Sequence, residues 1–477
     1  MANPRLVKAI SRLAPFHIPI SWSFVARLSP LRKKVAGNIG WVISGNCFQT
    51  LVGLFVLAMI ARHLGPDRLG MLSYAINLAV LFTSIATLGM EGIVIRDMVK
   101  APHLTETILG TAFTLRMAGA SVAIVGVVVT AWMIHSDRWV IPYVILIGLA
   151  FFPQAFEVID LWFQKNIQSK FSVLAKSTAV FVGGGIKLTF VLLNAPLIFF
   201  CAAYTLDFAL IAVAMVWIYR NRGQHLLRWR FSFPIAAQIL RDSWPLILSG
   251  VLIISYMRIE QFLVMNFLGS HVAGIYFASC KIVEIWVLMA MIILNSVYPI
   301  LVLKRHTDLE VYHQKMQFVF DFMTGAGIFV AIGIFLFAPQ IIQVLYGSHY
   351  SEATKILVIQ AWMAPILFCG AARGCYFLLE NITIYHTWGA MIGIIFNVLL
   401  AFPLMERYGA SGAAAAALIS YVISVYGTSY LFPRLRECAR FQTRALVLPF
   451  RFSEFRRNLN VTAESSGRNR GSQFPDP

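Results

Sequence analysis

Charged side chains occur inside the longest apolar stretches of this chain, where a charge that faces lipid costs roughly 2.5–3.5 kcal/mol. The basic ones are Arg116, Lys176, Lys187, Arg258, Lys281 and Arg373, and the acidic ones are Glu91, Glu157, Asp160, Asp207, Glu260, Glu284 and Asp321. A guanidinium group suits a phosphate, because its fork donates two parallel hydrogen bonds. A buried carboxylate can titrate far from its solution range, so it suits the binding and release of a proton. These residue types predict a polar site within the apolar part of the chain.

Spacing separates the candidates for this site from charges with a simpler explanation. Arg258 and Glu260 are two residues apart and point to nearly opposite sides of a helix. Lys281 and Glu284 are three apart, so they share a face and can neutralise each other. The charges nearer to the ends of their stretches can extend to the membrane surface instead; these are Glu91, Glu157, Asp160, Lys176 and Asp321.

The remaining charges lie well inside their stretches, and Arg116, Asp207 and Arg373 have no near partner in sequence. We therefore expect a substrate anion to be bound by Arg116, Arg258, Arg373 and Lys281, which requires the arginines to converge. The expected ion-coupling carboxylates are Glu260 and Asp207.

Signatures of catalysis and of cofactor binding are missing from the sequence. It contains no P-loop, no HExxH metal motif and no GxSxG nucleophile motif. The six cysteines are scattered and form no CxxC pair, so we expect neither a metal site nor a disulfide framework. The segments between apolar stretches are short, which leaves little room for the polar loops of an enzyme. A transporter without catalytic residues or a cofactor is the favoured class.

Composition places these charges in a membrane protein. Of the 477 residues, 59% are hydrophobic and 13% are charged, so the chain cannot supply the polar surface of a soluble protein. Unbroken apolar stretches argue for helices rather than a membrane barrel. Twelve of them can be drawn, at 36–62, 69–95, 107–134, 138–163, 169–192, 195–219, 242–267, 272–303, 314–338, 353–379, 384–404 and 409–432. The fold class predicted is an all-α polytopic membrane protein with about twelve transmembrane helices.

The distribution of Lys and Arg predicts the orientation. With the N-terminus inside, the cytoplasmic segments hold 28 of these residues and the outside segments hold 5. The net charge of +18 is thus explained without nucleic acid. The predicted segments are a basic cytoplasmic N-terminal segment (1–35), helices 1–6 (36–219), a basic cytoplasmic linker (220–241), helices 7–12 (242–432) and a basic cytoplasmic tail (433–477). In that tail arginines alternate with apolar residues, so we expect it to bind the membrane surface, to be dispensable for the fold and to end in disorder.

A short motif recurs in the two predicted halves. Residues 64–70 and residues 268–274 both carry Leu-Gly, then four further residues, then a second glycine, and the two motifs are 204 residues apart. Both motifs lie between the first two helices of a half. Parallel repeats of six helices that rock about a central cavity are a known transporter design. We therefore predict two six-helix bundles around such a cavity.

Several of these segments together resemble the Wzx-type polysaccharide flippases of the multidrug/oligosaccharidyl-lipid/polysaccharide exporter superfamily, over residues 36–432. The residues that carry the likeness are Asn38 to Trp41, Arg62 to Pro66, Leu69-Gly70, Leu88-Gly89-Met90, Ile95-Arg96-Asp97, Arg258 to Gln261, Gly274-Ile275-Tyr276, Leu345-Tyr346-Gly347 with Tyr350 and Ala353, and Tyr408 to Ala413. The family tends to show Arg-x-Asp where this chain has Arg258-Ile259-Glu260.

The resemblance implies a function and a location. Such proteins move an undecaprenyl-diphosphate-linked oligosaccharide across the bacterial inner membrane by ion-coupled alternating access, for exopolysaccharide, capsule or O-antigen assembly. The implied partners are the lipid-linked oligosaccharide, membrane lipids, and the polymerase and export proteins of a polysaccharide pathway. A multidrug exporter of the same fold is the main alternative, and it would favour an acidic cavity. A glycosyltransferase or polymerase of the pathway would need a large catalytic loop, which the sequence does not show.

Overall fold

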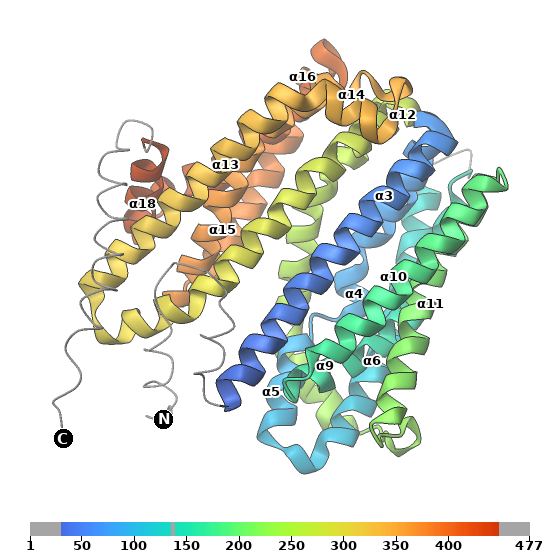
Figure 1. Ribbon diagram of the computed structural model, residues 1–477, viewed down its shortest axis with the longest axis vertical. Helices are drawn as coiled ribbons and strands as arrows, with labels where there is room; N and C mark the ends of the chain where they lie inside the picture. The colour runs from blue at the N-terminus through green and yellow to red at the C-terminus, as the bar shows by residue number, and fades with distance from the viewer. Residues whose placement is uncertain (1–29, 135–138, 448–477) are drawn as a thin grey trace, which may run out of the picture.

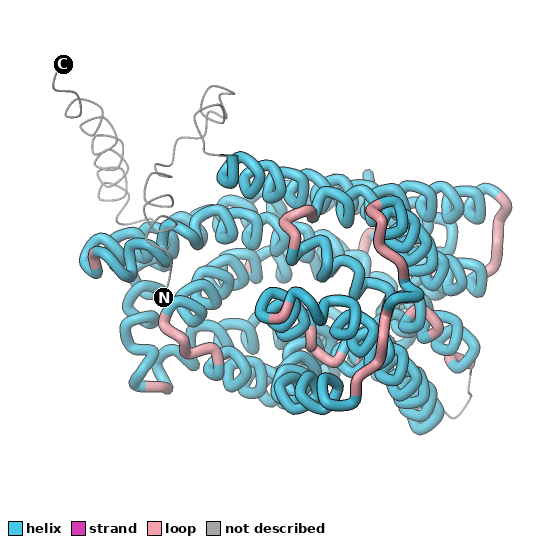
Figure 2. Tube along the Cα trace, turned by 90° about the horizontal axis from the view of Figure 1, so that it is seen from below, coloured by secondary structure: helices cyan, strands magenta, loops and turns pink. Residues whose placement is uncertain are grey.

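The computed structural model describes residues 30–134 and 139–447, and in this described part the chain forms helices and turns without strands. Its first helices are α3 (Pro30–Leu81), α4 (Thr83–Thr87), α5 (Glu91–Lys100), α6 (Thr105–Ile134), α7 (Ile141–Gly148), α8 (Phe151–Gln154), α9 (Val158–Lys165), α10 (Ser169–Leu192) and α11 (Leu197–Asn221). They are followed by α12 (Phe233–Thr307), α13 (Leu309–Tyr346), α14 (Ala353–Ala361), α15 (Met363–Leu379), α16 (Ile384–Val422), the π-helix η5 (Ile423–Gly427), α17 (Thr428–Leu431) and α18 (Arg436–Leu446). Figure 2 shows that short loops join these helices.

Eight described helices are long and apolar enough to cross a membrane, or nine when α14 and α15, which meet at 41°, count as one span. The predicted all-α, multi-pass membrane architecture is confirmed. Three of the helices contain a glycine with left-handed φ, at Gly65 (70°), Gly269 (84°) and Gly409 (58°). Only glycine adopts such a conformation readily, and it breaks the helix. The predicted number of twelve spans depends on dividing α3, α12 and α16 at these glycines, which lie between predicted stretches or at the start of one.

The helices form two groups, which we call the N-terminal half (α3–α11) and the C-terminal half (α12–α18). Figure 1 shows α10, α11 and α6 gathered beside α3 on one side, and α13, α15 and α18 gathered beyond α12 on the other. One buried apolar cluster extends across both halves and includes Leu78 of α3, Tyr276 of α12 and Leu357 of α14. The two halves are therefore joined by a continuous core.

The repeated Leu-Gly motifs lie against each other at one end of this core. A Cβ atom on Gly70 would lie 1.9 Å from the carbonyl oxygen of Ser270, and a Cβ atom on Gly274 would lie 1.9 Å from that of Pro66. The same glycine-to-backbone contact is thus made twice, once by each half. This reciprocity is the signature of a two-fold contact between equivalent turns, and it explains why both motifs require their second glycine.

Helix α18 differs from the expectation for the C-terminal tail. Leu435, Cys438, Phe441 and Ala445 are buried in a core cluster formed with α12, α13 and α15. The Phe441 ring stacks on Phe320 at 5.8 Å between ring centroids. The arginines of this segment lie on the opposite, exposed face of the helix. The apolar face of residues 436–446 packs on protein rather than on the membrane surface, which argues against the prediction that the tail is dispensable for the fold. Residues 448–477 lie outside the described residues.

Replacing Phe441 with alanine is expected to destabilise the C-terminal half by about 3 kcal/mol, the usual cost of removing a buried phenylalanine ring. The measurement is the thermal unfolding temperature of the detergent-solubilised full chain. Leu446→Ala on the same helix is the matched control, since that side chain is exposed. Equal unfolding temperatures for the Phe441→Ala variant and the wild type would show that α18 does not contribute to the core.

Candidate functional site

Two cations and one carboxylate meet on the two segments of α12. Arg258 donates a hydrogen bond from Nη1 to Glu284 Oε1 at 2.5 Å, and Lys281 donates from Nζ to Glu284 Oε2 at 2.7 Å. One carboxylate thus serves two cations, which leaves the cluster with a net charge of about +1. The side chains of Arg258, Lys281 and Glu284 are 19%, 26% and 36% exposed, so the cluster is reachable from outside the protein core. We call these three residues the triad.

The triad lies away from the ends of the two segments of α12. At about 1.5 Å per residue, Arg258 and Glu284 are about 17 and 23 Å along the helix from the break at Gly269, so both lie inside the apolar stretches. Tyr204 of α11, in the other half, lies within electrostatic range of Arg258. The predicted pairing of Lys281 with Glu284 is confirmed, and Arg258 is added to it.

Glu260 lies in a different environment from Arg258, as their spacing predicted. Its side chain accepts hydrogen bonds from the Tyr276 hydroxyl at 3.2 Å and from Asn397 Nδ2 at 3.1 Å. Asn397 also donates to the Ser420 hydroxyl at 3.1 Å. Glu260 is 7% exposed, and these partners are all neutral. The arrangement presents a buried carboxylate surrounded by neutral hydrogen-bonding groups, which suits the binding of a proton or a small monovalent cation.

Arg116 is held inside the N-terminal half. It is 1% exposed and donates from Nη2 to Glu91 Oε1 at 3.1 Å. Its Nε and Nη1 atoms have no hydrogen-bond partner among the described residues. At 1% exposure, the guanidinium group is enclosed by protein on all sides.

Asp207 has a partner that the sequence does not reveal. Lys187 of α10 donates a hydrogen bond to Asp207 Oδ2 on α11, and both side chains are mostly buried. A Cβ atom on Gly183 would lie 2.2 Å from Asp207 Oδ1, so glycine at that position makes room for the carboxylate. This pair neutralises the charge that made Asp207 a candidate. Asp160 and Lys176 form a second internal pair at 2.7 Å.

Arg373 is separate from the other predicted cations. It is 5% exposed and donates to the carbonyl oxygen of Ser424 and to the hydroxyl of Thr428. Among the described residues, Arg116, Arg258 and Arg373 share no hydrogen-bond partner. The structure therefore brings together Arg258 and Lys281 and leaves Arg116 and Arg373 in separate surroundings.

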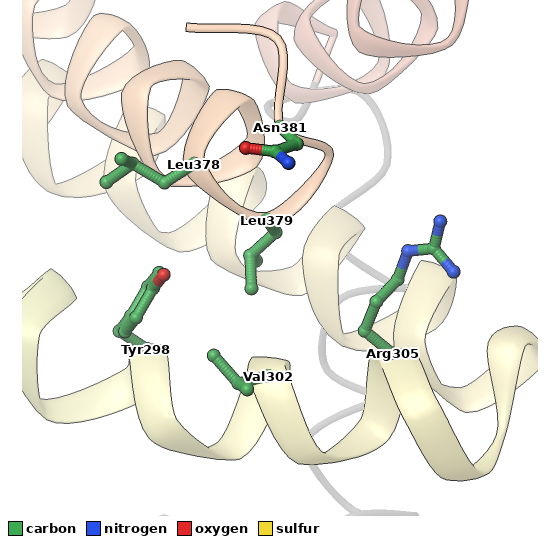
Figure 3. A pocket seen from close by; sticks show the side chains of 6 residues that line it. All are labelled: Tyr298, Val302, Arg305, Leu378, Leu379 and Asn381. Carbon is green, nitrogen blue, oxygen red and sulfur yellow. The ribbon is translucent and has the colours of Figure 1, made fainter. Parts of the chain in front are cut away.

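A pocket of about 300 Å³ lies elsewhere in the C-terminal half, between the end of α12 and the end of α15 (Figure 3). It is lined by Tyr298, Val302, Arg305, Leu378, Leu379 and Asn381. Arg305 is already bound to both oxygens of Glu380, at 2.8 and 2.9 Å. These hydrogen bonds raise the pKa of Arg305 above its ordinary value. Burial opposes the charge of Glu380, but hydrogen bonds from Arg305 and Tyr312 outweigh it and lower the pKa of that carboxyl. The charges at this pocket are thus satisfied within the protein.

Comparison with known proteins identifies the family. A family model described as polysaccharide biosynthesis protein matches residues 59–355, which is more than half of the chain. The chain belongs to this family. Capsular polysaccharide biosynthesis protein CapF of Staphylococcus aureus is 20% identical over 414 residues, which cover 83% of this chain and 99% of that protein. A putative O-antigen transporter of Shigella dysenteriae is 22% identical over 275 residues, which cover 55% of this chain and 66% of that protein.

Solved structures share the fold of this polysaccharide biosynthesis protein. The lipid II flippase MurJ in an inward closed conformation aligns with a TM-score of 0.62 at 13% identity, over 88% of this chain and 96% of that structure. An inward-facing multidrug resistance MATE family transporter aligns with a TM-score of 0.59 at 15% identity, over 84% and 94%. The resemblance that the sequence motifs predicted is confirmed. The likeness to both kinds of transporter shows the fold alone and does not discriminate between their substrates.

Formal charge does not reveal the neutral partners of Glu260. Asn397 and Ser420 lie in apolar stretches and carry no charge, and Tyr276 belongs to the Gly274-Ile275-Tyr276 motif. One signal was available: a buried polar residue must find hydrogen-bond partners, and Asn397 is surrounded in sequence by Ile394, Ile395, Phe396 and Val398. Such a residue predicts a polar partner on a neighbouring helix.

Proposed function

We propose that this protein moves a lipid-linked oligosaccharide, carried on undecaprenyl diphosphate, from the cytoplasmic leaflet to the opposite leaflet of a bacterial inner membrane. The triad is the observation that carries the proposal. It presents a net positive charge of about +1, partly exposed, inside the apolar stretches of α12. A pyrophosphate cannot cross hydrocarbon unaided, and it needs cationic hydrogen-bond donors along its path. Membership of the polysaccharide biosynthesis family supplies the class of cargo.

The proposal assigns roles to some of the predicted site residues. Arg258 and Lys281 contact the pyrophosphate, and Arg258 does so with the two parallel donors of its guanidinium fork. Arg116 stays paired with Glu91 inside the N-terminal half and is not assigned a contact with the substrate. Glu260 carries the coupling ion, because it is buried among neutral donors and has no basic side chain bonded to it. Asp207 stays paired with Lys187 and is not assigned a coupling role.

Transport by alternating access fits the contacts between the halves. The two Leu-Gly turns contact each other at one end of the molecule, while α5 and α9 lie toward the other end (Figure 1). We place that other end, the 220–241 linker and both termini in the cytoplasm, on the distribution of Lys and Arg. The polymerase and export proteins of the same pathway would receive the flipped oligosaccharide.

A multidrug exporter is the competing function, because it shares the fold. Its organic cation substrates would be repelled by the net positive triad, which favours an anionic cargo. Deleting the gene in the organism that carries it discriminates between the two. We expect loss of a surface glycan and accumulation of its lipid-linked precursor in the membrane. Increased sensitivity to cationic drugs with an intact surface glycan would contradict the proposal.

Complementing that deletion with a Glu260→Gln variant tests ion coupling. Glutamine keeps the size of the side chain and removes its titration, so we expect surface glycan to fall severalfold and its dependence on external pH to flatten. Glu406→Gln is the matched control, since Glu406 lies exposed on α16. Protein levels are checked by blotting the membrane fraction. A Glu260→Gln variant with the wild-type level and pH profile would exclude this carboxylate as the coupling group.

A further inference from the structure

Arg373 of α15 is a buried cation whose partners are backbone carbonyl groups. Its Nη1 atom donates to the carbonyl oxygens of Ser424 at 2.7 Å and Val425 at 3.1 Å, and its Nη2 atom donates to the Thr428 hydroxyl at 2.9 Å. No carboxylate among the described residues forms an ion pair with it. A buried charge without a counter-ion is costly, so its retention calls for a specific role.

The carbonyl groups that Arg373 binds belong to the π-helix η5. A π-turn widens the helix and leaves carbonyl oxygens outside the regular α-helical ladder, and such turns frequently occur at functional sites. Several side chains complete the bonding here. The Thr428 hydroxyl donates to Ser424 O at 2.5 Å, and Gln442 of α18 donates to Val425 O at 3.1 Å. Arg373 and these neighbours hold the π-turn in one conformation.

Gly389 of α16 makes space for the contact between Arg373 and the π-turn. A Cβ atom on Gly389 would lie 3.2 Å from both Arg373 Nη2 and Ser424 O. The Ser424 hydroxyl donates in turn to the carbonyl oxygen of Gly389 at 2.8 Å. The π-turn is thus hydrogen-bonded to the first segment of α16 as well as to α15. A shift of Arg373 would therefore change the contacts of the π-turn with α15 and with α16.

One helical turn connects the π-turn to the environment of Glu260. Ser420 precedes Ser424 by four residues, so the two share a helix face. The Ser420 hydroxyl accepts a hydrogen bond from Asn397 Nδ2, and Asn397 also donates to Glu260. The contacts therefore run without interruption from Arg373 through η5, Ser420 and Asn397 to the carboxylate.

We propose that Arg373 is a positioning residue for Glu260: by fixing the π-turn in η5, it holds Ser420 and Asn397 in the geometry that stabilises the ionised carboxylate. This rests on the proposed role of Glu260 as the coupling group. It replaces the expectation that Arg373 binds substrate. Gln442 extends the same support to α18, so the cytoplasmic helix contributes to the geometry of the ion site.

Other groups that titrate or carry charge lie within electrostatic range of Glu260, and they set the background for any pH effect. They are Tyr256 and Arg258 on its own segment of α12, Tyr276 and Cys280 on the following segment, and Tyr421 on α16. None of them is changed in the experiment below. A change in the pH midpoint of Glu260 therefore reports a change in the position of Asn397.

The test is the pH dependence of carbodiimide labelling of Glu260 in the detergent-solubilised full chain. The probe is dicyclohexylcarbodiimide, which reacts with protonated carboxyl groups in apolar surroundings, and labelled peptides are quantified by mass spectrometry. Arg373→Gln removes the charge, and Thr428→Val removes one acceptor with little change in size. Thr130→Val on α6 is the matched control, because Thr130 makes the same bond to the carbonyl four residues earlier and accepts no hydrogen bond from an arginine of the described residues.

We expect both Arg373→Gln and Thr428→Val to raise the pH of half-maximal labelling by about one unit, as when a hydrogen bond to a charged group weakens. Thr130→Val should leave it unchanged. Wild-type midpoints in both Arg373→Gln and Thr428→Val would overturn the positioning role, whatever their transport activity. The proposed function fails separately, if Glu260→Gln transports normally while wild-type Glu260 still labels with a clear pH midpoint.

Discussion

An Arg258→Ala variant is expected to lose transport, with surface glycan reduced by about tenfold or more in the complemented deletion strain. The substitution removes the fork that would bind the pyrophosphate, and it leaves Lys281 neutralised by Glu284. Hydrogen bonds to charged groups contribute about 1.5–3 kcal/mol each, which corresponds to factors of roughly 10 to 150. Arg258→Lys keeps the positive charge but loses the paired donors, so an intermediate level of surface glycan is expected from that variant.

The control for Arg258 is Arg407→Ala, since Arg407 is exposed and its guanidinium lies over the Tyr408 ring. Membrane levels of all variants are compared by blot, so that loss of protein is not mistaken for loss of transport. Accumulation of the lipid-linked precursor in the Arg258→Ala strain is the second measurement. Normal surface glycan in the Arg258→Ala variant would mean that the triad has a structural role only.

The elements of the fold could largely be predicted, because helices in a membrane are specified by length and apolarity alone. The helix breaks in α3 and α12 fall at Gly65 and Gly269, which lie between two predicted apolar stretches. The break in α16 falls at Gly409, the first residue of the last predicted stretch. The reciprocal packing of Gly70 and Gly274 could not be predicted from the repeat, since a glycine in a turn has a sufficient local explanation in its backbone freedom.

The charged residues were easier to find than their partners. Lys187 and Asp207 lie on successive helices, and their approach depends on the packing of α10 against α11. Arg373 binds carbonyl oxygens, which every residue carries, so no side-chain pattern could have identified its partners. In α18, arginines alternating with apolar residues describe equally well a helix on a lipid surface and a helix on protein. Tertiary packing decided between these alternatives.

The second large effect is expected at the contact between the two Leu-Gly turns. Asp67 of the first turn accepts hydrogen bonds from the Ser270 hydroxyl at 3.2 Å and from His271 Nδ1 at 2.9 Å in the second. Nearby, Arg62 donates to the carbonyl oxygens of Val344 and Leu345, and these bonds also join the two halves. If the halves rock about a central site, this end of the molecule must open once in every cycle.

Linking the turns covalently should therefore stop transport. We expect a variant with Asp67→Cys and His271→Cys, treated with a short bifunctional thiol reagent, to lose nearly all transport and to recover it when the link is cleaved. The exposed Cys47 is replaced by serine in this background, because it would react with the reagent. Each single cysteine variant, treated in the same way, is the control. Full transport by the linked double variant would mean that the halves do not separate at these turns, and the substrate would have to leave by a path that keeps this end closed.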